Sequence, residues 1–191
     1  MVVAVGNRVL LYNASDGNLI LSLRAHKDTV YCVDFDRTGQ RFASGSADCS
    51  VIIWSEKVRL LARSPALLLS LAEPRFSNDA HLLIAALSFL LRPQGKPILK
   101  YSHADSIQRV VYNPTTDALA SCTNSDFGLW SPEEKAVAKY KVQSKILSAS
   151  WSNDGQFLAL GMFSGQITIR DRKGNEKVRM PSLGLCVFLL S

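Results

Sequence analysis

His26, Ser44 and Asp48 are the three residue types of a hydrolase triad, in which a histidine takes the serine proton and an aspartate orients the histidine. The segment from Ser44 to Asp48 has the composition of a strand that ends in a turn, and no donors for an oxyanion are apparent beside it. We therefore predict that these residues do not form a catalytic site.

Other patterns that could carry chemistry each lack a necessary part. The Ser44–Asp48 segment has no lysine of the kind that a phosphate-binding loop requires. Asp126-Phe127-Gly128 resembles a kinase motif, but it precedes a predicted strand and no catalytic loop accompanies it. The histidines are His26, His81 and His103, and no pair of His, Cys, Asp or Glu has metal-ligand spacing. We predict a protein that is not an enzyme and has no cofactor, no metal site and no small-molecule substrate.

The chain that positions these residues is repetitive. Three stretches, beginning at His26, His103 and Val142, can be superposed with the same offsets for most of their length. The matching apolar positions are Val30, Val33, Phe35 and Phe42-Ala43 in the first stretch, Ile107, Val110, Tyr112 and Leu119-Ala120 in the second, and Ile146, Ala149, Trp151 and Leu158-Ala159 in the third. Agreement at so many positions predicts an array of similar supersecondary units.

Each unit has the pattern of short β-strands. Runs rich in β-branched and aromatic residues alternate with turns about every ten residues, and no 3.6-residue period persists. We expect strands over residues 29–34, 41–45, 50–54 and 98–101, and earlier ones over 2–5, 9–12 and 19–23. Four antiparallel strands in about 40 residues are typical of a propeller blade. The predicted fold class is all-β, with about three and a half four-stranded blades.

The copies resemble repeats of the WD40 family. His26, Ser44, Asp48 and Trp54 stand where that family places its structural tetrad. The resemblance implies that Asp48 orients His26, that the imidazole bonds Ser44, and that the hydroxyl reaches the indole N–H. Such a chain would pair polar groups that each cost about 1–3 kcal/mol when buried alone.

The later copies depart from this pattern. The second copy keeps three tetrad positions and, being one residue shorter, has only an approximate equivalent of the aspartate. Its residues are His103, Ser121, Trp130 and Asp126. The third copy has Val142, Leu160 and Arg170 at the His, Ser and Trp positions. We expect that the network is lost there and that replacing Arg170 has little effect.

Particular strings narrow the resemblance. They are Gly6–Tyr12, His26–Val33, Arg41–Asp48, Ser50–Trp54, Ser125–Glu133 and Asn153–Phe163. Together they resemble the N-terminal propeller of the WD-repeat subunits of intraflagellar transport complex A. The resemblance implies a non-enzymatic scaffold that supports retrograde ciliary transport, cilium assembly and receptor entry into cilia. Its partners would be other complex A subunits, bound through propeller rims, and its location the cilium and ciliary base, the cytoplasm and the cytoskeleton.

Charge leaves an alternative open. The net charge of +6 suggests a generic WD40 adaptor associated with nucleic acid or chromatin, but lysines and arginines are spread along the chain with acids between them. A solvated propeller rim explains that distribution better. The four cysteines form no C-x-x-C pair, which suits free thiols in a reducing compartment, and no secretory leader is apparent.

One internal segment does not fit the repeat. Propeller blades are expected over 1–57 and 95–180, separated by an atypical insertion, 58–94, and followed by an atypical tail, 181–191. The insertion is rich in Leu, Ala, Ser and Arg. It is explained by a helical functional insertion or by translated intron sequence, and we favour the second. A transmembrane segment is poorly supported, since the longest apolar run, Leu82–Leu91, is far below the roughly 20 residues that span a bilayer.

Overall fold

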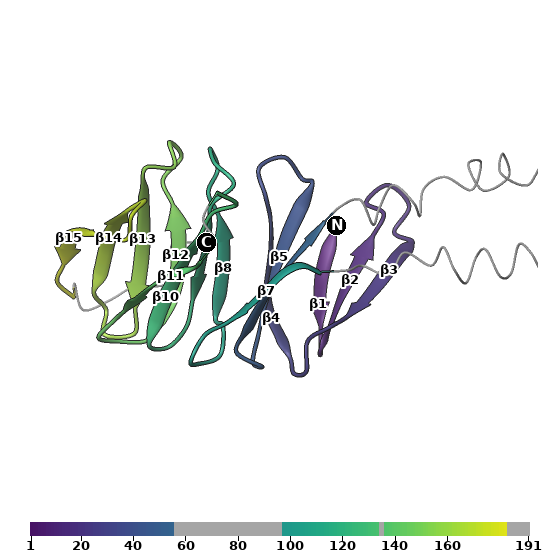
Figure 1. Cartoon of the computed structure of the whole chain (residues 1–191), viewed down its shortest axis with the longest axis horizontal. Helices are drawn as coiled ribbons and strands as arrows, with labels where there is room; N and C mark the ends of the chain where they lie inside the picture. The colour runs from purple at the N-terminus through teal and green to yellow at the C-terminus, as the bar shows by residue number, and fades with distance from the viewer. Residues whose placement is uncertain (56–96, 134–135, 183–191) are drawn as a thin grey trace, which may run out of the picture.

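The computed structural model describes residues 1–55, 97–133 and 136–182. Those ranges contain fifteen β-strands and no helix, so the predicted all-β class is confirmed (Figure 1). The strands form one three-stranded sheet and three four-stranded sheets, all antiparallel, as expected of a partial propeller. We number these sheets blade 1 to blade 4 in chain order.

Each blade contains consecutive strands. Blade 1 contains β1 (Val2–Val5), β2 (Arg8–Tyr12) and β3 (Leu19–Arg24). Blade 2 contains β4 (Val30–Phe35), β5 (Arg41–Ser46), β6 (Ser50–Ser55) and β7 (Pro97–Ser102). Blade 3 contains β8 (Arg109–Tyr112), β9 (Leu119–Cys122), β10 (Asp126–Trp130) and β11 (Ala138–Lys141). Blade 4 contains β12 (Ile146–Trp151), β13 (Phe157–Met162), β14 (Ile167–Asp171) and β15 (Glu176–Met180).

The blades stand side by side in chain order, like an open fan (Figure 1). The first strands of blades 2, 3 and 4 lie next to one another, since β8 contacts both β4 and β12. The last strands, β7 and β11, are the opposite edges of their sheets. Tight turns join the strands, and Gly39 and Gly155 supply the left-handed backbone that two of these turns require, with φ of 68° and 66°.

Three apolar cores lie between the blades instead of within them. The core between blades 1 and 2 contains Val9, Leu11, Leu23, Val30, Phe42, Ile52 and Trp54. The core between blades 2 and 3 contains Ala43, Val51, Ile53, Ile107, Val110, Tyr112, Leu119 and Trp130. The core between blades 3 and 4 contains Ala120, Cys122, Phe127, Leu129, Ile146, Ala149, Trp151, Leu158 and Leu160. Each sheet thus buries both faces only when a neighbour stands on each side.

Polar contacts also join neighbouring blades. The Asp34 carboxylate of β4 accepts a hydrogen bond from the Tyr112 backbone N–H of β8 at 2.7 Å. The Arg41 guanidinium of blade 2 lies 2.6 Å from the Asp117 carboxylate of blade 3. These contacts fix the spacing of the blades that the cores hold together.

The expected insertion, 58–94, lies outside the described residues, and so does the tail beyond residue 182. The domain boundaries on either side of them therefore stay predictions. Within the described ranges, no helix is long and apolar enough to span a membrane.

Candidate functional site

The first polar network joins side chains from several parts of blade 2. His26 lies in the connection before β4, Ser44 lies on β5 and Trp54 lies on β6. The Ser44 hydroxyl oxygen is 2.8 Å from His26 Nε2 and 2.8 Å from Trp54 Nε1. His26 Nδ1 is 3.2 Å from the Asp48 carboxylate. These contacts assign one direction of donation: the indole N–H donates to Ser44, the hydroxyl donates to Nε2, and Nδ1–H donates to Asp48.

The turn between β5 and β6 holds Asp48 in place. Its carboxylate accepts hydrogen bonds from the Lys27 backbone N–H at 2.8 Å, from the Ser50 backbone N–H at 3.0 Å and from the Ser50 hydroxyl at 2.5 Å. Partial burial acts to raise the pKa of Asp48, but the hydrogen bonds from Ser50 and Lys27 and the adjacent His26 lower it to about 2. The carboxylate is therefore ionised at neutral pH and serves only as an acceptor.

The second network occupies the same place in blade 3. His103 Nε2 lies 2.8 Å from the Ser121 hydroxyl oxygen, and His103 Nδ1 lies 2.6 Å from the Asp126 carboxylate. Because the β9–β10 turn is one residue shorter than the β5–β6 turn, Asp126 is the first residue of its strand, the register position of Ser50 in blade 2. It nevertheless reaches the imidazole, and Thr123 Oγ1 donates to the same oxygen at 2.8 Å.

The fourth member differs between the two networks. Trp130 has the register position of Trp54, because each pairs with the residue two before the network serine. The Trp130 indole N–H does not donate to Ser121 and has no acceptor within the described parts of the chain. The Tyr101 hydroxyl, from β7 of blade 2, lies 3.1 Å from Ser121 Oγ and donates to it instead. The blade 3 network therefore takes its fourth member from the neighbouring blade.

Tyr101 was missed by reasoning from the sequence. The available signal was its position two residues before His103, which Tyr140 repeats two residues before Val142. Tyr140 also crosses to the next blade, where its hydroxyl donates to the Lys173 carbonyl at 2.5 Å. A tyrosine two residues before the histidine position of a copy thus links adjacent blades by a hydrogen bond from its hydroxyl.

Blade 4 has different contacts at the corresponding positions. Val142 and Leu160 belong to the apolar core with blade 3. The Arg170 guanidinium lies 5.7 Å from the centroid of the Phe127 ring, and its Nη2 lies 2.7 Å from the Glu176 carboxylate. The side chain of Arg170 is only 13% exposed. The expectation that replacing Arg170 has little effect is therefore revised.

Burial separates both networks from solvent. His26 is 6% exposed, His103 is 7% exposed, and both network serines are fully buried. Burial lowers the pKa of both imidazoles, although the carboxylate opposite each one acts in the other direction. Both imidazoles are therefore neutral at pH 7. An enclosed, fully paired serine of this kind is suited to joining strands and not to attacking a substrate.

The remaining reactive groups are likewise enclosed. Burial raises the pKa of the Cys122 thiol and raises the pKa of Cys32 to about 12, which makes both poor nucleophiles. Phe127 of the kinase-like tripeptide is buried in the core between blades 3 and 4. Over the described ranges, no group of three or more His, Cys, Asp or Glu could hold a metal ion.

Comparison with known proteins agrees with this geometry. The family model described as WD domain, G-beta repeat matches residues 17–55, which run from the end of blade 1 through β6. Residues 17–55 are thus similar to a WD40 repeat.

Several proteins similar to this chain are named intraflagellar transport protein 122 homolog. This chain is 50% identical to the protein of Xenopus tropicalis and 47% identical to those of Danio rerio and Homo sapiens, in each case over 184 residues. Each match covers 96% of this chain and 12% of the relative. The chain therefore spans about an eighth of the length of these relatives, and the match extends across both sides of residues 58–94.

Proposed function

We propose that this WD40 chain is part of a non-enzymatic interaction scaffold in intraflagellar transport. The observation that carries the proposal is the identity of 47% to 50%, over 96% of the chain, to proteins named for intraflagellar transport. The site supports it, because the triad-like residues are enclosed within the blades and so serve the shape of the propeller. Partners would then be bound by exposed rims, where WD40 proteins differ from one another.

In its finer form, the proposal is that the chain belongs to a WD-repeat subunit of complex A. It would support retrograde ciliary transport, cilium assembly and receptor entry into cilia. Its partners would be the other complex A subunits, and it would reside at the cilium and ciliary base, in the cytoplasm and on the cytoskeleton. Because the chain spans 12% of its relatives, these activities are proposed for the longer assembly to which it would contribute.

The two polar networks have a structural role in this proposal. His26, Ser44, Asp48 and Trp54 form the tetrad of blade 2. His103, Ser121, Asp126 and Tyr101 form the equivalent unit at blade 3, with Trp130 at the tetrad position but outside the hydrogen bonds. Residues 1–57 and 95–180 form the propeller part, which leaves 58–94 and 181–191 as the segments that differ from it.

Affinity purification of the tagged chain from ciliated cells tests this function. We expect complex A subunits to co-purify, and we expect the yield to fall when Trp54→Ala disrupts blade 2. Salt-sensitive recovery of nucleic acid without those subunits would contradict the proposal and favour the alternative suggested by the charge of +6. A matched surface variant, Lys27→Gln, controls for charge, because Lys27 is exposed and contributes only its backbone to the network.

A further inference from the structure

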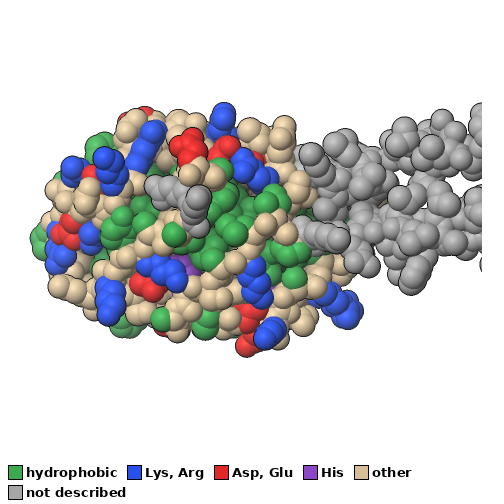
Figure 2. Space-filling view, in the orientation of Figure 1, with side chains coloured by type: hydrophobic (Ala, Val, Ile, Leu, Met, Phe, Trp, Pro, Cys, Tyr) green, Lys and Arg blue, Asp and Glu red, His purple; other side chains and the backbone are tan. Residues whose placement is uncertain are grey.

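A pocket of about 530 Å³ opens between the last strand of blade 2 and the outer part of blade 3. Leu99 and Tyr101 of β7 line one wall of it, and Trp130 and Val137 of blade 3 line the other. The same four side chains pack in or against the core between these two blades, so the pocket continues that core outwards. Figure 2 shows hydrophobic side chains as a band across the middle of this face, with charged side chains around the band. An apolar recess with a polar border is typical of an interaction site.

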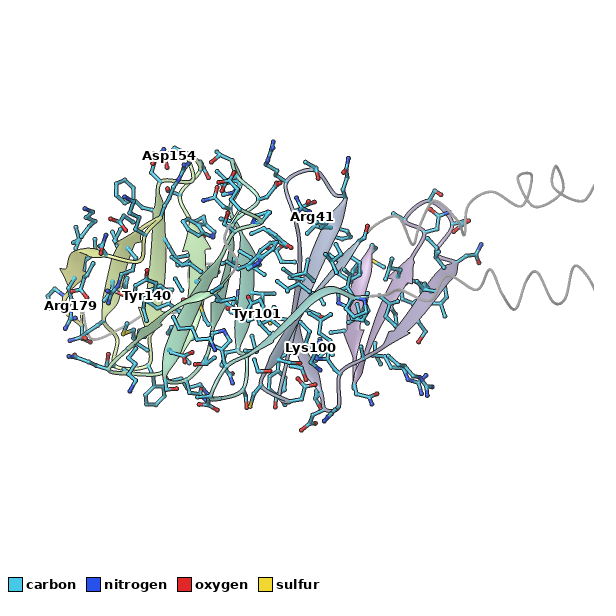
Figure 3. All side chains as sticks on the ribbon, viewed as in Figure 1. Arg41, Lys100, Tyr101, Tyr140, Asp154 and Arg179 are labelled. Carbon is cyan, nitrogen blue, oxygen red and sulfur yellow. The ribbon has the colours of Figure 1, made fainter. Side chains whose placement is uncertain are left out.

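The walls of the pocket carry little free charge. Lys139 lies on the wall of blade 3, but its ammonium group already donates to the Ser102 carbonyl at 2.5 Å. Lys100 pairs with Ile52, which puts its side chain on the face of β7 towards blade 1 (Figure 3). Among the described residues that line the pocket there is no Asp or Glu. Because burial of an unpaired charge is costly, these walls favour an uncharged ligand.

The wall of blade 3 contains a hydrogen-bond donor without a partner. Because Tyr101 donates to Ser121 in its place, the Trp130 indole N–H has no acceptor among the residues that the structure describes. Trp130 is only 8% exposed, yet its indole nitrogen is not fully buried, so a ligand in the pocket can reach it. Trp54 and Trp151, in contrast, both have acceptors. A carbonyl oxygen of a ligand would give the Trp130 donor its missing partner.

The remaining lining selects a particular kind of uncharged ligand. Aromatic rings stand on both walls, from Tyr101 and Trp130, and the exposed Pro132 also lines the pocket. A polyproline II segment has no internal hydrogen bonds, so its carbonyl oxygens are free to accept a donor such as an indole N–H. Proline itself has no N–H that would need an acceptor in an apolar recess. Proline-rich segments dock in aromatic-lined grooves for these reasons, and their stiffness keeps the entropy cost low.

We infer that this pocket binds an uncharged, proline-rich segment of a partner protein in the polyproline II conformation. One of its carbonyl oxygens would accept the Trp130 indole N–H, and its proline and leucine side chains would cover Leu99, Tyr101 and Val137. The chain's own residues 183–191 contain no proline, so the chemistry favours a partner over that segment. The inference rests on the interaction role proposed above and gives that role a location and a ligand chemistry.

Titration of the purified full chain with a fluorescein-labelled octapeptide tests the inference. The probe is Pro-Pro-Leu-Pro-Pro-Leu-Pro-Pro, and the control replaces every Pro by Ala. We expect saturable binding of the probe with a Kd below about 1 mM, followed by fluorescence anisotropy. We expect the control to bind at least several-fold more weakly, because it loses the preformed conformation and gains N–H groups that need acceptors. Added salt should leave the affinity of the probe unchanged, because no ion pair is formed.

Variants and indole resonances locate the contact. Trp130→Phe keeps an aromatic ring and removes the N–H, so it should weaken binding roughly two- to tenfold, the factor that corresponds to one hydrogen bond. Trp151→Phe removes an N–H that the fold itself uses, outside the pocket, and should leave the affinity unchanged. In ¹H–¹⁵N spectra the probe should shift the Trp130 indole resonance, assigned with Trp130→Phe, and not those of Trp54 and Trp151.

Three results would each overturn the inference: no saturation by about 1 mM, equal binding of the proline and alanine peptides, or an unmoved Trp130 resonance with bound probe. Tighter binding of the alanine peptide would indicate a strand added to the edge of β7 and would also contradict it. Equal losses of affinity in Trp130→Phe and Trp151→Phe would do the same, since they would reflect a general loss of structure. Probe binding that appears only after removal of residues 183–191 would name that segment as the occupant and count against a partner. A negative titration leaves the co-purification result untouched, so failure here is distinguishable from failure of the ciliary assignment.

Discussion

In blade 3 the hydrogen bond to Ser121 comes from Tyr101 and not from Trp130. Double-mutant cycles can test this assignment, because they measure the interaction free energy of each pair of side chains. In blade 2 the Trp54 N–H donates to Ser44, whereas in blade 3 the donor crosses from the neighbouring blade. Two tryptophans at one register position therefore differ in a single hydrogen bond. Changing Trp54 or Trp130 to Phe keeps an aromatic ring and removes the N–H from each.

The expected magnitudes follow from the contacts. A hydrogen bond contributes about 0.5–1.5 kcal/mol to the free energy of unfolding, so Trp54→Phe and Ser44→Ala should be coupled by about 1 kcal/mol. Trp130→Phe and Ser121→Ala should show coupling near zero. The long Tyr101–Ser121 contact, at 3.1 Å, places the coupling of Tyr101→Phe with Ser121→Ala at the lower end of that range.

Urea unfolding, followed by far-UV circular dichroism, gives these energies for each single and double variant. The midpoint and slope are compared within each cycle, because a changed slope would indicate that one blade unfolds before the others. Coupling of Trp130 with Ser121 as large as that of Trp54 with Ser44 would refute the reasoning. So would the absence of coupling between Tyr101 and Ser121.

Two further predictions concern stability. Because burial lowers the pKa of both network histidines below the ordinary 6.5, the unfolded chain binds more protons than the folded chain below that pH. Stability should therefore be fully present above about pH 6.5 and fall on acidification, by at most about 1.4 kcal/mol per pH unit for each histidine. Urea midpoints that do not change between neutral and mildly acidic buffer would contradict this. Arg170→Ala should cost about 1 kcal/mol, since it removes a cation–π contact with Phe127, and exposed Arg24→Ala should cost less. Equal shifts in melting temperature for the two variants would show that the Arg170 contacts add no stability.

The strands were predictable because their signals are local. Alternating apolar runs and glycine turns locate β4, β5 and β6 to within about one residue of the expected ranges. Apolar runs separated by turns also indicated three strands before His26, which form blade 1. The shorter second copy was visible too, since the residue missing from its turn moves Asp126 into its strand.

Contacts that cross between blades were not predictable from within one repeat. Tyr101 reaches Ser121 because the two blades pack at a particular distance, and no spacing in the chain encodes that distance. In the sequence, Arg170 stands where the other copies have a tryptophan, which suggested that the contact of that tryptophan was lost. In the structure, the planar Arg170 guanidinium lies over the Phe127 ring of blade 3. Offsets specify which residues are equivalent, whereas neighbours decide what each equivalent residue touches.

Because Tyr101 and Tyr140 each form a hydrogen bond with the adjacent blade, a single blade cannot be replaced without losing such bonds. If blade 3 were cut out at its sheet boundaries and transplanted, its serine would lose the donor that arrives from β7, and its own Tyr140 would have no carbonyl to meet. A transplantable unit would instead begin with the last strand of one sheet and continue through the first three of the next. Engineered hybrids cut at that offset should keep their hydrogen bonds, while hybrids cut between sheets should break one at every seam.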